Sequence, residues 1–287
     1  MEARPSCPLC DGSNIKKVYA RGRLPISKCS CGMVFLSSQH MSESPTHFYG
    51  AEYYHSWGLD GDQEDIPRVI KHRTFQSWLR RVDALVTPGR LLDVGCATGF
   101  FLEVAASAGW DVAGVELSAY SAGLAGRKFG HRIFKGTLGQ AGFPDGAFEL
   151  VTLTDLLEHI PTPRLFMKEV RRILRDAGVL MIVTPNAASL SLALMGSKWS
   201  HFKLEHLCYF APKTICRLLR DSGFALIGLE SARKYLDFAY IVNQFKTYPH
   251  PWLSPLLKTI DQVVPEGLKH VSLPLPCGEM LVLARKE

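Results

Sequence analysis

Short apolar runs alternate with amphipathic stretches along the middle of the chain. The apolar runs have the length and composition of buried strands, which predicts strands at residues 91–94, 110–116, 132–135, 147–154, 179–184, 224–230 and 280–284. The stretches between them carry apolar residues at helical spacing, which predicts helices over residues 66–86, 100–108, 118–129, 161–175 and 212–222. This alternation is typical of an α/β fold with a doubly wound, mostly parallel, seven-stranded Rossmann-like sheet.

A glycine-rich turn follows the first predicted strand. Residues 95–99 read Gly-Cys-Ala-Thr-Gly, and a helical stretch begins at Phe100. This arrangement lets a nucleotide-like ligand approach the backbone, because glycine has no Cβ and adopts positive φ easily. The turn lacks the lysine of a P-loop and the full GxGxxG pattern. Asp93 precedes it, and a carboxylate there would repel a pyrophosphate but attract a cation.

A second carboxylate ends the next strand. Glu116 follows the glycine turn by about 20 residues, where an acidic residue of dinucleotide-binding folds bonds ribose hydroxyls. Taken alone, Glu116 could equally be a solvated acid at a strand end. Together with Asp93 and the turn, it favours the binding of a ribose.

Polar residues also cluster after the fourth strand. Asp155, Glu158 and His159 come directly after residues 147–154, and the carboxyl ends of parallel strands face the ligand crevice of such sheets. The long segment 187–211 adds His206, again preceded by a glutamate. Histidine titrates in the range that suits a general base, so either histidine could take a proton from a bound substrate.

Two close cysteine pairs lie near the N-terminus. Cys7 and Cys10 form a C-x-x-C pair, and Cys29 and Cys31 form a C-x-C pair. Four thiolates on two short loops can hold a tetrahedral zinc ion, and they leave no open position for catalysis. The sequence therefore predicts a structural zinc site; four free thiols are the alternative.

Composition limits the remaining possibilities. The 287 residues are 47% hydrophobic and 21% charged, with a formal charge of +6 spread among interspersed acids, so nucleic-acid binding is disfavoured. We expect a cytoplasmic protein with no membrane span, and a homodimer is possible. The predicted organisation is a zinc-ribbon-like module at residues 1–40, a linker and helical segment at 41–88, and a ligand-binding domain at 89–287. Substrate-capping insertions are expected at about 187–211 and 231–277.

The motifs resemble a known family. The stretch from Asp93 to Gly99 is similar to motif I (D-x-G-x-G-x-G) of class I S-adenosylmethionine (SAM)-dependent methyltransferases, with Ala97 in place of the middle glycine. FELVTLTDLLEHI, RRILRDAGVLMIVTPN and KLEHLCYFAPKTICRLLRDSGF resemble the Methyltransf_23 type of this class. The resemblance covers roughly residues 86–230, and cysteine modules recur in front of such domains.

The resemblance implies SAM as cofactor and a set of contact residues around the strand ends. Thr137 and Leu138 enter only by their position, where related enzymes contact adenine. The implied cofactor residues are Asp93, Gly95, Cys96, Ala97, Gly99, Phe100, Glu116, Leu117, Thr137, Leu138, Thr154 and Asp155.

The implied reaction is methyl transfer to a small-molecule acceptor. A hydroxyl oxygen of a sugar or natural-product intermediate is favoured, with His159, His206 and Glu158 as catalytic candidates. Asp155, Glu158, His159 and His206 also resemble the ligand set of metal-dependent class I relatives, so a second divalent ion is possible. A carbon or nitrogen acceptor, RNA methylation, and a zinc-ribbon binding protein with a degenerate fold are the alternatives.

Overall fold

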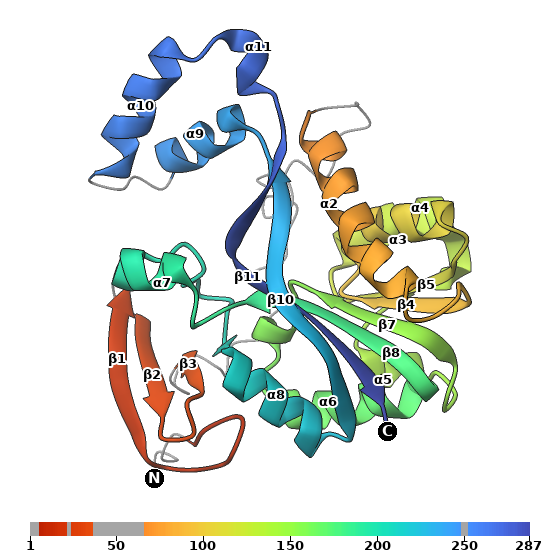
Figure 1. Ribbon diagram of the computed structural model, residues 1–287. Coiled ribbons are helices and arrows are strands. Elements are labelled where there is room, and N and C mark those ends of the chain that lie inside the picture. Colours follow the sequence, from red (N-terminus) through yellow and green to blue (C-terminus); the bar gives the residue numbers. More distant parts are fainter. Residues whose placement is uncertain (1–5, 22–23, 37–65, 248–251) are drawn as a thin grey trace.

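The computed structural model describes residues 6–21, 24–36, 66–247 and 252–287, and Figure 1 shows their arrangement. Most of the predicted linker therefore lies outside the described residues. Five strands of the main sheet are parallel: β4 (Arg90–Val94), β5 (Asp111–Glu116), β6 (Ile133–Lys135), β7 (Phe148–Thr154) and β8 (Leu174–Pro185). The last strand, β11 (Leu273–Lys286), runs antiparallel to β8 and to β10 (Phe224–Leu236).

The sheet is buried on both faces because its strands are apolar at consecutive positions. Leu91 packs with α2 (Ile66–Asp83), α3 (Phe100–Ser107) and α4 (Ala119–Phe129), whereas the next residue, Leu92, packs with the opposite core. That second core includes α5 (Leu138–Ala141), α6 (Pro163–Ile173) and α8 (Pro212–Asp221). Successive side chains of a strand point to opposite faces, so an unbroken apolar run requires helices on both. The predicted doubly wound fold is confirmed.

Helix α6 illustrates how the sequence forms these covering layers. Pro163 occupies its first turn, where the missing N–H costs nothing, and Met167, Val170 and Ile173 are fully buried on one face. The predicted extent of this helix, residues 161–175, is two residues too long at each end. The chain leaves the helix at Ile173 and pairs at once with β7, where Leu174 lies opposite Phe148.

The strand order creates a crevice at the carboxyl ends of the parallel strands. The order is β10-β11-β8-β7-β4-β5-β6, so the chain moves from β4 to one side for β5 and β6, and then to the other side for β7. This reversal is a topological switch point, where ligands bind in open α/β sheets. The predicted cofactor residues follow or end β4, β5, β6 and β7.

The last two strands are much longer than predicted, with 13 residues in β10 and 14 in β11. β10 and β11 continue beyond the sheet as a two-stranded ribbon, and Figure 1 shows that this ribbon carries a separate group of helices. These helices are α9 (Phe238–Thr247), α10 (Leu253–Val263) and α11 (Glu266–Lys269). They form the predicted 231–277 insertion, whose capping role stays a prediction.

A second, four-stranded antiparallel sheet is built from the N-terminal segment. It contains β1 (Ile15–Arg21), β2 (Leu24–Cys29) and β3 (Val34–Leu36), and its fourth strand is β9 (Cys208–Tyr209). The predicted 187–211 insertion supplies β9 as well as α7 (Leu190–Met195) and the short helix η5 (Gly196–Lys198). Part of this insertion therefore joins the N-terminal sheet to the main domain. No helix in the described ranges is both long and apolar enough to cross a bilayer.

The packing of the core predicts the cost of a truncation in β7. The ring of Phe148 is fully buried and meets Phe143 edge to face with ring centres 5.0 Å apart. Replacing it by alanine should lower the free energy of unfolding by about 3–5 kcal/mol, because the neighbouring side chains cannot close the cavity. Chemical denaturation would measure this. Leu165→Ala is the control, because Leu165 is 62% exposed, and its cost should stay within about 0.5 kcal/mol. Equal costs would contradict the described core.

Candidate active site and cysteine cluster

The glycine turn after β4 is tied to the neighbouring strand by backbone hydrogen bonds. The N–H groups of Gly95 and Cys96 both donate to the carbonyl oxygen of Val115, at 2.8 and 3.1 Å. Gly95, Ala97 and Gly99 have φ angles of +76°, +48° and +79°. Glycine takes these values easily, whereas Ala97 has a Cβ and is held there against a steric cost.

Glu116 holds Ala97 in this conformation. The backbone N–H of Ala97 donates to Oε2 of Glu116 at 2.8 Å, and the N–H of Ser118 donates to Oε1 at 2.8 Å. Burial raises the pKa of the Glu116 carboxyl, while the N–H groups of Ser118 and Ala97 lower it. Each carboxylate oxygen can accept more than one hydrogen bond, so Glu116 can bind hydroxyl groups while it keeps the turn in place.

Asp93 lies deeper than Glu116 and links two strands. Its side chain is 1% exposed, and the Thr152 hydroxyl donates to its Oδ1 at 2.7 Å, which joins β4 to β7. Burial raises its pKa to about 7, with a hydrogen bond from Thr152 acting in the opposite direction and the charge of Glu116 adding to the rise. Asp93 therefore supports the start of the turn from inside the sheet, and its predicted contact with the cofactor stays a prediction.

The other predicted cofactor residues surround the same strand ends. Thr137 caps α5, with its hydroxyl accepting from the Gln140 N–H, and the Gly136 N–H donates to the Glu116 carbonyl oxygen. This bond brings the Thr137 and Leu138 segment beside the second carboxylate. Cys96 is buried within the turn, Phe100 begins α3, Leu117 follows Glu116, and Thr154 ends β7.

Three further predicted residues come together after β7. Glu158 and His159 lie in the short helix η4 (Leu157–His159), and His206 comes from the segment before β9. Their ligand atoms all lie within 4.8 Å of one another, and the two imidazole rings meet edge to face at 4.7 Å. The Thr184 hydroxyl donates to Oε2 of Glu158 at 2.9 Å.

Burial shifts the pKa of each of these three groups in the direction that favours its neutral form. It lowers the pKa of His159 to about 4 and holds the pKa of His206 well below its usual range, with the positive charge of neighbouring groups adding to the effect on His206. Burial and the charge of Asp155 raise the pKa of Glu158 well above its usual range. Nδ1 of His159 lies 2.9 Å from the Glu205 carbonyl oxygen, and a carbonyl only accepts, so Nδ1 carries the proton. Nε2 is then the basic nitrogen of the ring.

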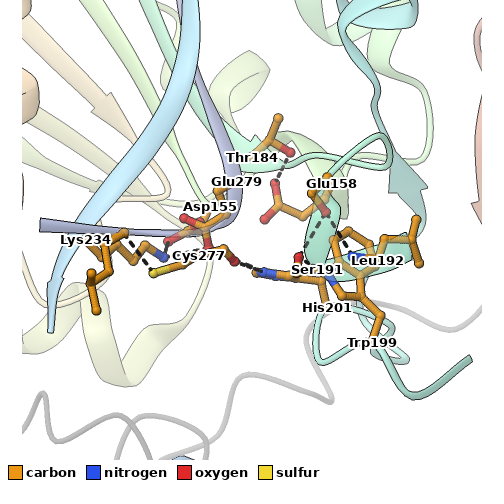
Figure 2. A network of polar contacts seen from close by, with 12 residues as sticks. Asp155, Glu158, Thr184, Ser191, Leu192, Trp199, His201, Lys234, Cys277 and Glu279 are labelled. Atoms are coloured by element: carbon orange, nitrogen blue, oxygen red, sulfur yellow. Dashed lines mark hydrogen bonds and ion pairs between the residues drawn. The ribbon is translucent and has the colours of Figure 1, made fainter. Parts of the chain in front are cut away.

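The fourth residue of the predicted metal set, Asp155, points toward a different partner. Its carboxylate lies 3.4 Å from Nζ of Lys234, which also contacts Glu279 at 2.7 Å; Figure 2 shows this network. Burial raises the pKa of Glu279 to about 7, and the charge of Asp155 adds to the rise while Lys234 opposes it. Sequence reasoning missed Lys234 and Glu279. Glu279 carried one signal, a carboxylate at the start of the last apolar run.

The four predicted cysteine ligands form a compact cluster. The Sγ atoms of Cys7 and Cys31 are 3.6 Å apart, as are those of Cys10 and Cys29, and all four lie within 4.8 Å of one another. Thiolates on one tetrahedral zinc ion, each at about 2.3 Å, lie about 3.8 Å apart. Burial raises the pKa of the Cys29 thiol, but hydrogen bonds from the Cys31 backbone and neighbouring thiols outweigh it and bring the pKa to about 7. The cluster has the ligands and spacing for a metal ion.

Comparison with known proteins identifies the domain. A family profile described as "Methyltransferase domain" (Methyltransf_23) matches residues 62–229, which is more than half of the chain. The chain belongs to this methyltransferase family. The enzyme is thus a SAM-dependent methyltransferase, as its glycine turn and two strand-end carboxylates predict.

Relatives and solved structures agree with this assignment. A protein of Methylococcus capsulatus named ubiquinone biosynthesis O-methyltransferase is 24% identical over 210 residues, covering 69% of this chain and 86% of the relative. A protein of the same name from Thiobacillus denitrificans is 28% identical over 189 residues, covering 60% and 79%. A SAM-dependent methyltransferase of Archaeoglobus fulgidus shares the fold with a TM-score of 0.54 and 16% identity, covering 83% of this chain and all of that one. A magnesium protoporphyrin IX methyltransferase of Synechocystis, solved with SAH bound, has a TM-score of 0.53 and 15% identity, covering 84% and 98%.

The polar groups at the switch point of the methyltransferase fit the ribose of its cofactor. A ribose offers two neighbouring hydroxyl donors, and Glu116 presents two acceptor oxygens at the switch point of the sheet. The neighbouring turn needs glycine at Gly95 and Gly99, because both have positive φ and because Leu156 and Phe129 occupy the space beside a Cβ.

The turn geometry predicts the effect of a side chain at Gly95. A Cβ there would lie 3.0 Å from Cδ1 of Leu156, on a backbone whose φ of +76° already disfavours L-residues. Gly95→Asp should weaken the binding of S-adenosylhomocysteine about 10- to 100-fold, since relieving about 1–3 kcal/mol of strain requires the turn to move. Isothermal titration calorimetry measures this affinity. Gly109→Asp is the matched control, because Gly109 also has positive φ but has open space around it. An unchanged affinity in the Gly95 variant would exclude the turn from the cofactor site.

Proposed function

We propose that this methyltransferase transfers the methyl group of SAM to a hydroxyl oxygen of a small molecule, a sugar or a natural-product intermediate. The observation that carries the proposal is the neutral imidazole of His159, held in one tautomer by the Glu205 carbonyl at the carboxyl end of β7. The curated relatives named O-methyltransferases support an oxygen acceptor.

The proposed roles divide between the two sides of the crevice. SAM, when bound, supplies an already electrophilic methyl group, so the protein needs to align the acceptor and exclude water. Glu116 and the turn after β4 would hold the cofactor. Nε2 of His159 would take the acceptor's proton, and the nearby carboxylate of Asp155 favours the imidazolium that forms.

A divalent ion at Glu158, His159 and His206 is the second candidate for activating the hydroxyl. It is favoured by the spacing of the three ligand atoms and by Nδ1 of His206, which is buried without a hydrogen-bond partner. Two imidazoles and a carboxylate suit several divalent metals. Such an ion would bind the acceptor oxygen and lower the pKa of its hydroxyl. Asp155 would then lie outside the ligand set, because it pairs with Lys234.

We further propose that the four cysteines bind a structural zinc ion. The fit rests on the four Sγ atoms, whose spacing matches a tetrahedral thiolate site. Such a site has no open position, so it would support the fold and take no part in methyl transfer.

Removing the imidazole of His159 tests the proposed base. His159→Ala should leave S-adenosylhomocysteine affinity unchanged and lower kcat about 10²- to 10⁴-fold, because no other group takes the proton as well. A panel of hydroxylated aromatics and sugars would first identify an acceptor by S-adenosylhomocysteine release. Steady-state kinetics with that acceptor then measure the effect, with and without added Mg²⁺ or Mn²⁺.

The control for this variant is His131→Ala, since His131 is exposed in the short helix η3 (Gly130–Arg132). Turnover at the unmodified rate in His159→Ala would remove His159 from the reaction. Activity that depends on the added ion in the unmodified protein would favour the metal candidate over a metal-free base.

Metal analysis tests the cysteine cluster. Purified protein should contain about one zinc ion per chain, and Cys10→Ser should lose it, since three thiolates and a hydroxyl bind zinc far more weakly. Elemental analysis after extensive dialysis gives the stoichiometry. Cys216→Ser, which changes a cysteine of α8 outside the cluster, should keep the ion. Metal-free protein with four titratable thiols in the cluster would rule the site out.

A further inference from the structure

The segment around β9 lies between the cysteine cluster's sheet and the proposed catalytic residues. Residues 205–210, here called the clasp, contain β9 and run between η4 and strand β3 of the N-terminal sheet. The clasp forms hydrogen bonds on both sides, and its contacts join two parts of the chain that are far apart in sequence.

On one side, the clasp fixes the catalytic residues. The Glu205 carbonyl accepts from Nδ1 of His159 at 2.9 Å, and the Leu207 N–H donates to the Glu158 carbonyl oxygen at 2.8 Å. The Cys208 thiol donates to the Ile160 carbonyl oxygen at 3.6 Å. The tautomer of His159 and the position of η4 therefore depend on where the clasp lies.

On the other side, the clasp is a strand of the N-terminal sheet. Val34 and Phe35 of β3 lie opposite Tyr209 and Cys208, and the Leu36 N–H donates to the Leu207 carbonyl oxygen at 2.9 Å. Leu207 thus bonds to η4 through its N–H and to β3 through its carbonyl oxygen. Displacing β3 would remove one of the two backbone hydrogen bonds of Leu207.

The cysteine cluster lies directly before β3 in the chain. This strand begins three residues after Cys31, and the turn that precedes it is closed by two bonds, from the Gly32 N–H to the Cys29 carbonyl and from the Cys29 N–H to the Met33 carbonyl. Cys7 and Cys29 share one buried core with Phe35 and Cys208. A bound ion would fix the turn at its thiolates, in addition to the hydrogen bonds and the buried side chains that hold it in the metal-free protein.

We propose that the metal ion held by the four cysteines positions the acceptor side of the active site through β3 and the clasp. The ion is a positioning element for His159 and His206, and it does not act on the cofactor side, where the turn after β4 is held by β5 and Glu116. This inference rests on the proposed roles of those histidines. By this inference, the N-terminal module helps to hold the catalytic residues in place and is more than a separate domain.

The test compares zinc-loaded protein with the zinc-free Cys10→Ser variant by hydrogen–deuterium exchange and kinetics. Amide exchange across residues 204–210 should accelerate on loss of zinc, and kcat should fall about 10- to 100-fold, as small misplacements of catalytic groups do. Exchange across residues 91–99 and the affinity for S-adenosylhomocysteine should stay within about twofold. The Cys216→Ser variant is the control and should match the unmodified protein.

A second variant breaks the link without touching the cysteines. Leu36→Pro removes the N–H that bonds to the Leu207 carbonyl, so zinc should be retained while exchange in the clasp rises and kcat falls. Val18→Pro makes the same change at an irregular point of the edge strand β1, where proline is tolerated, and should have no effect on kcat.

Two results would overturn the inference. Unchanged exchange in the clasp after zinc loss would show that the ion stabilises only its own module. A parallel loss of S-adenosylhomocysteine affinity would show that the ion supports the whole fold and not the acceptor side. Full turnover of His159→Ala would instead overturn the proposed base, and the exchange measurement would still decide whether zinc controls the clasp.

Discussion

The structure depends on one carboxylate at the switch point of its main sheet. Glu116 ends β5 and accepts backbone hydrogen bonds from Ala97, in the turn after β4, and from Ser118, at the start of the next helix. These bonds hold Ala97 at positive φ and align the two strand ends that flank the crevice. Every proposed cofactor contact assumes that this turn keeps its shape, and the acceptor side is useful only if the cofactor binds next to it.

The acceptor side, unlike the glycine turn, is assembled from several separate segments of the chain. Its polar groups come from residues far apart in the sequence, including Glu158 and His159 after β7, and Lys234 and Glu279 on the long ribbon. Burial removes the charge of the histidines, so the base proposed for His159 exists in the active neutral form without titration at physiological pH. The Glu205 carbonyl that orients this imidazole belongs to the segment that pairs with β3 of the N-terminal sheet, which gives the proposed metal-binding module a role in such a domain.

Much of the fold could be predicted because its signals are local. Apolar runs located the central strands, and the Gly95–Gly99 turn and Glu116 lie at the switch point of the sheet, where the cofactor is proposed to bind. The clasp could not be predicted, since two residues of β9 have no periodicity of their own and gain strand structure only from β3. The sequence also did not show two contacts of the site. The hydrogen bond from Thr152 to Asp93 depends on the order of the strands. The pairing of Asp155 with Lys234 depends on the length of the ribbon formed by β10 and β11.

A crystal structure of the protein with S-adenosylhomocysteine would show whether Glu116 holds the cofactor. We expect both ribose hydroxyls within hydrogen-bonding distance of the Glu116 carboxylate, with the bond from the Ala97 N–H retained and the sulfur directed toward His159. S-adenosylhomocysteine bound elsewhere, or bound here with its ribose away from Glu116, would rule out this role of Glu116.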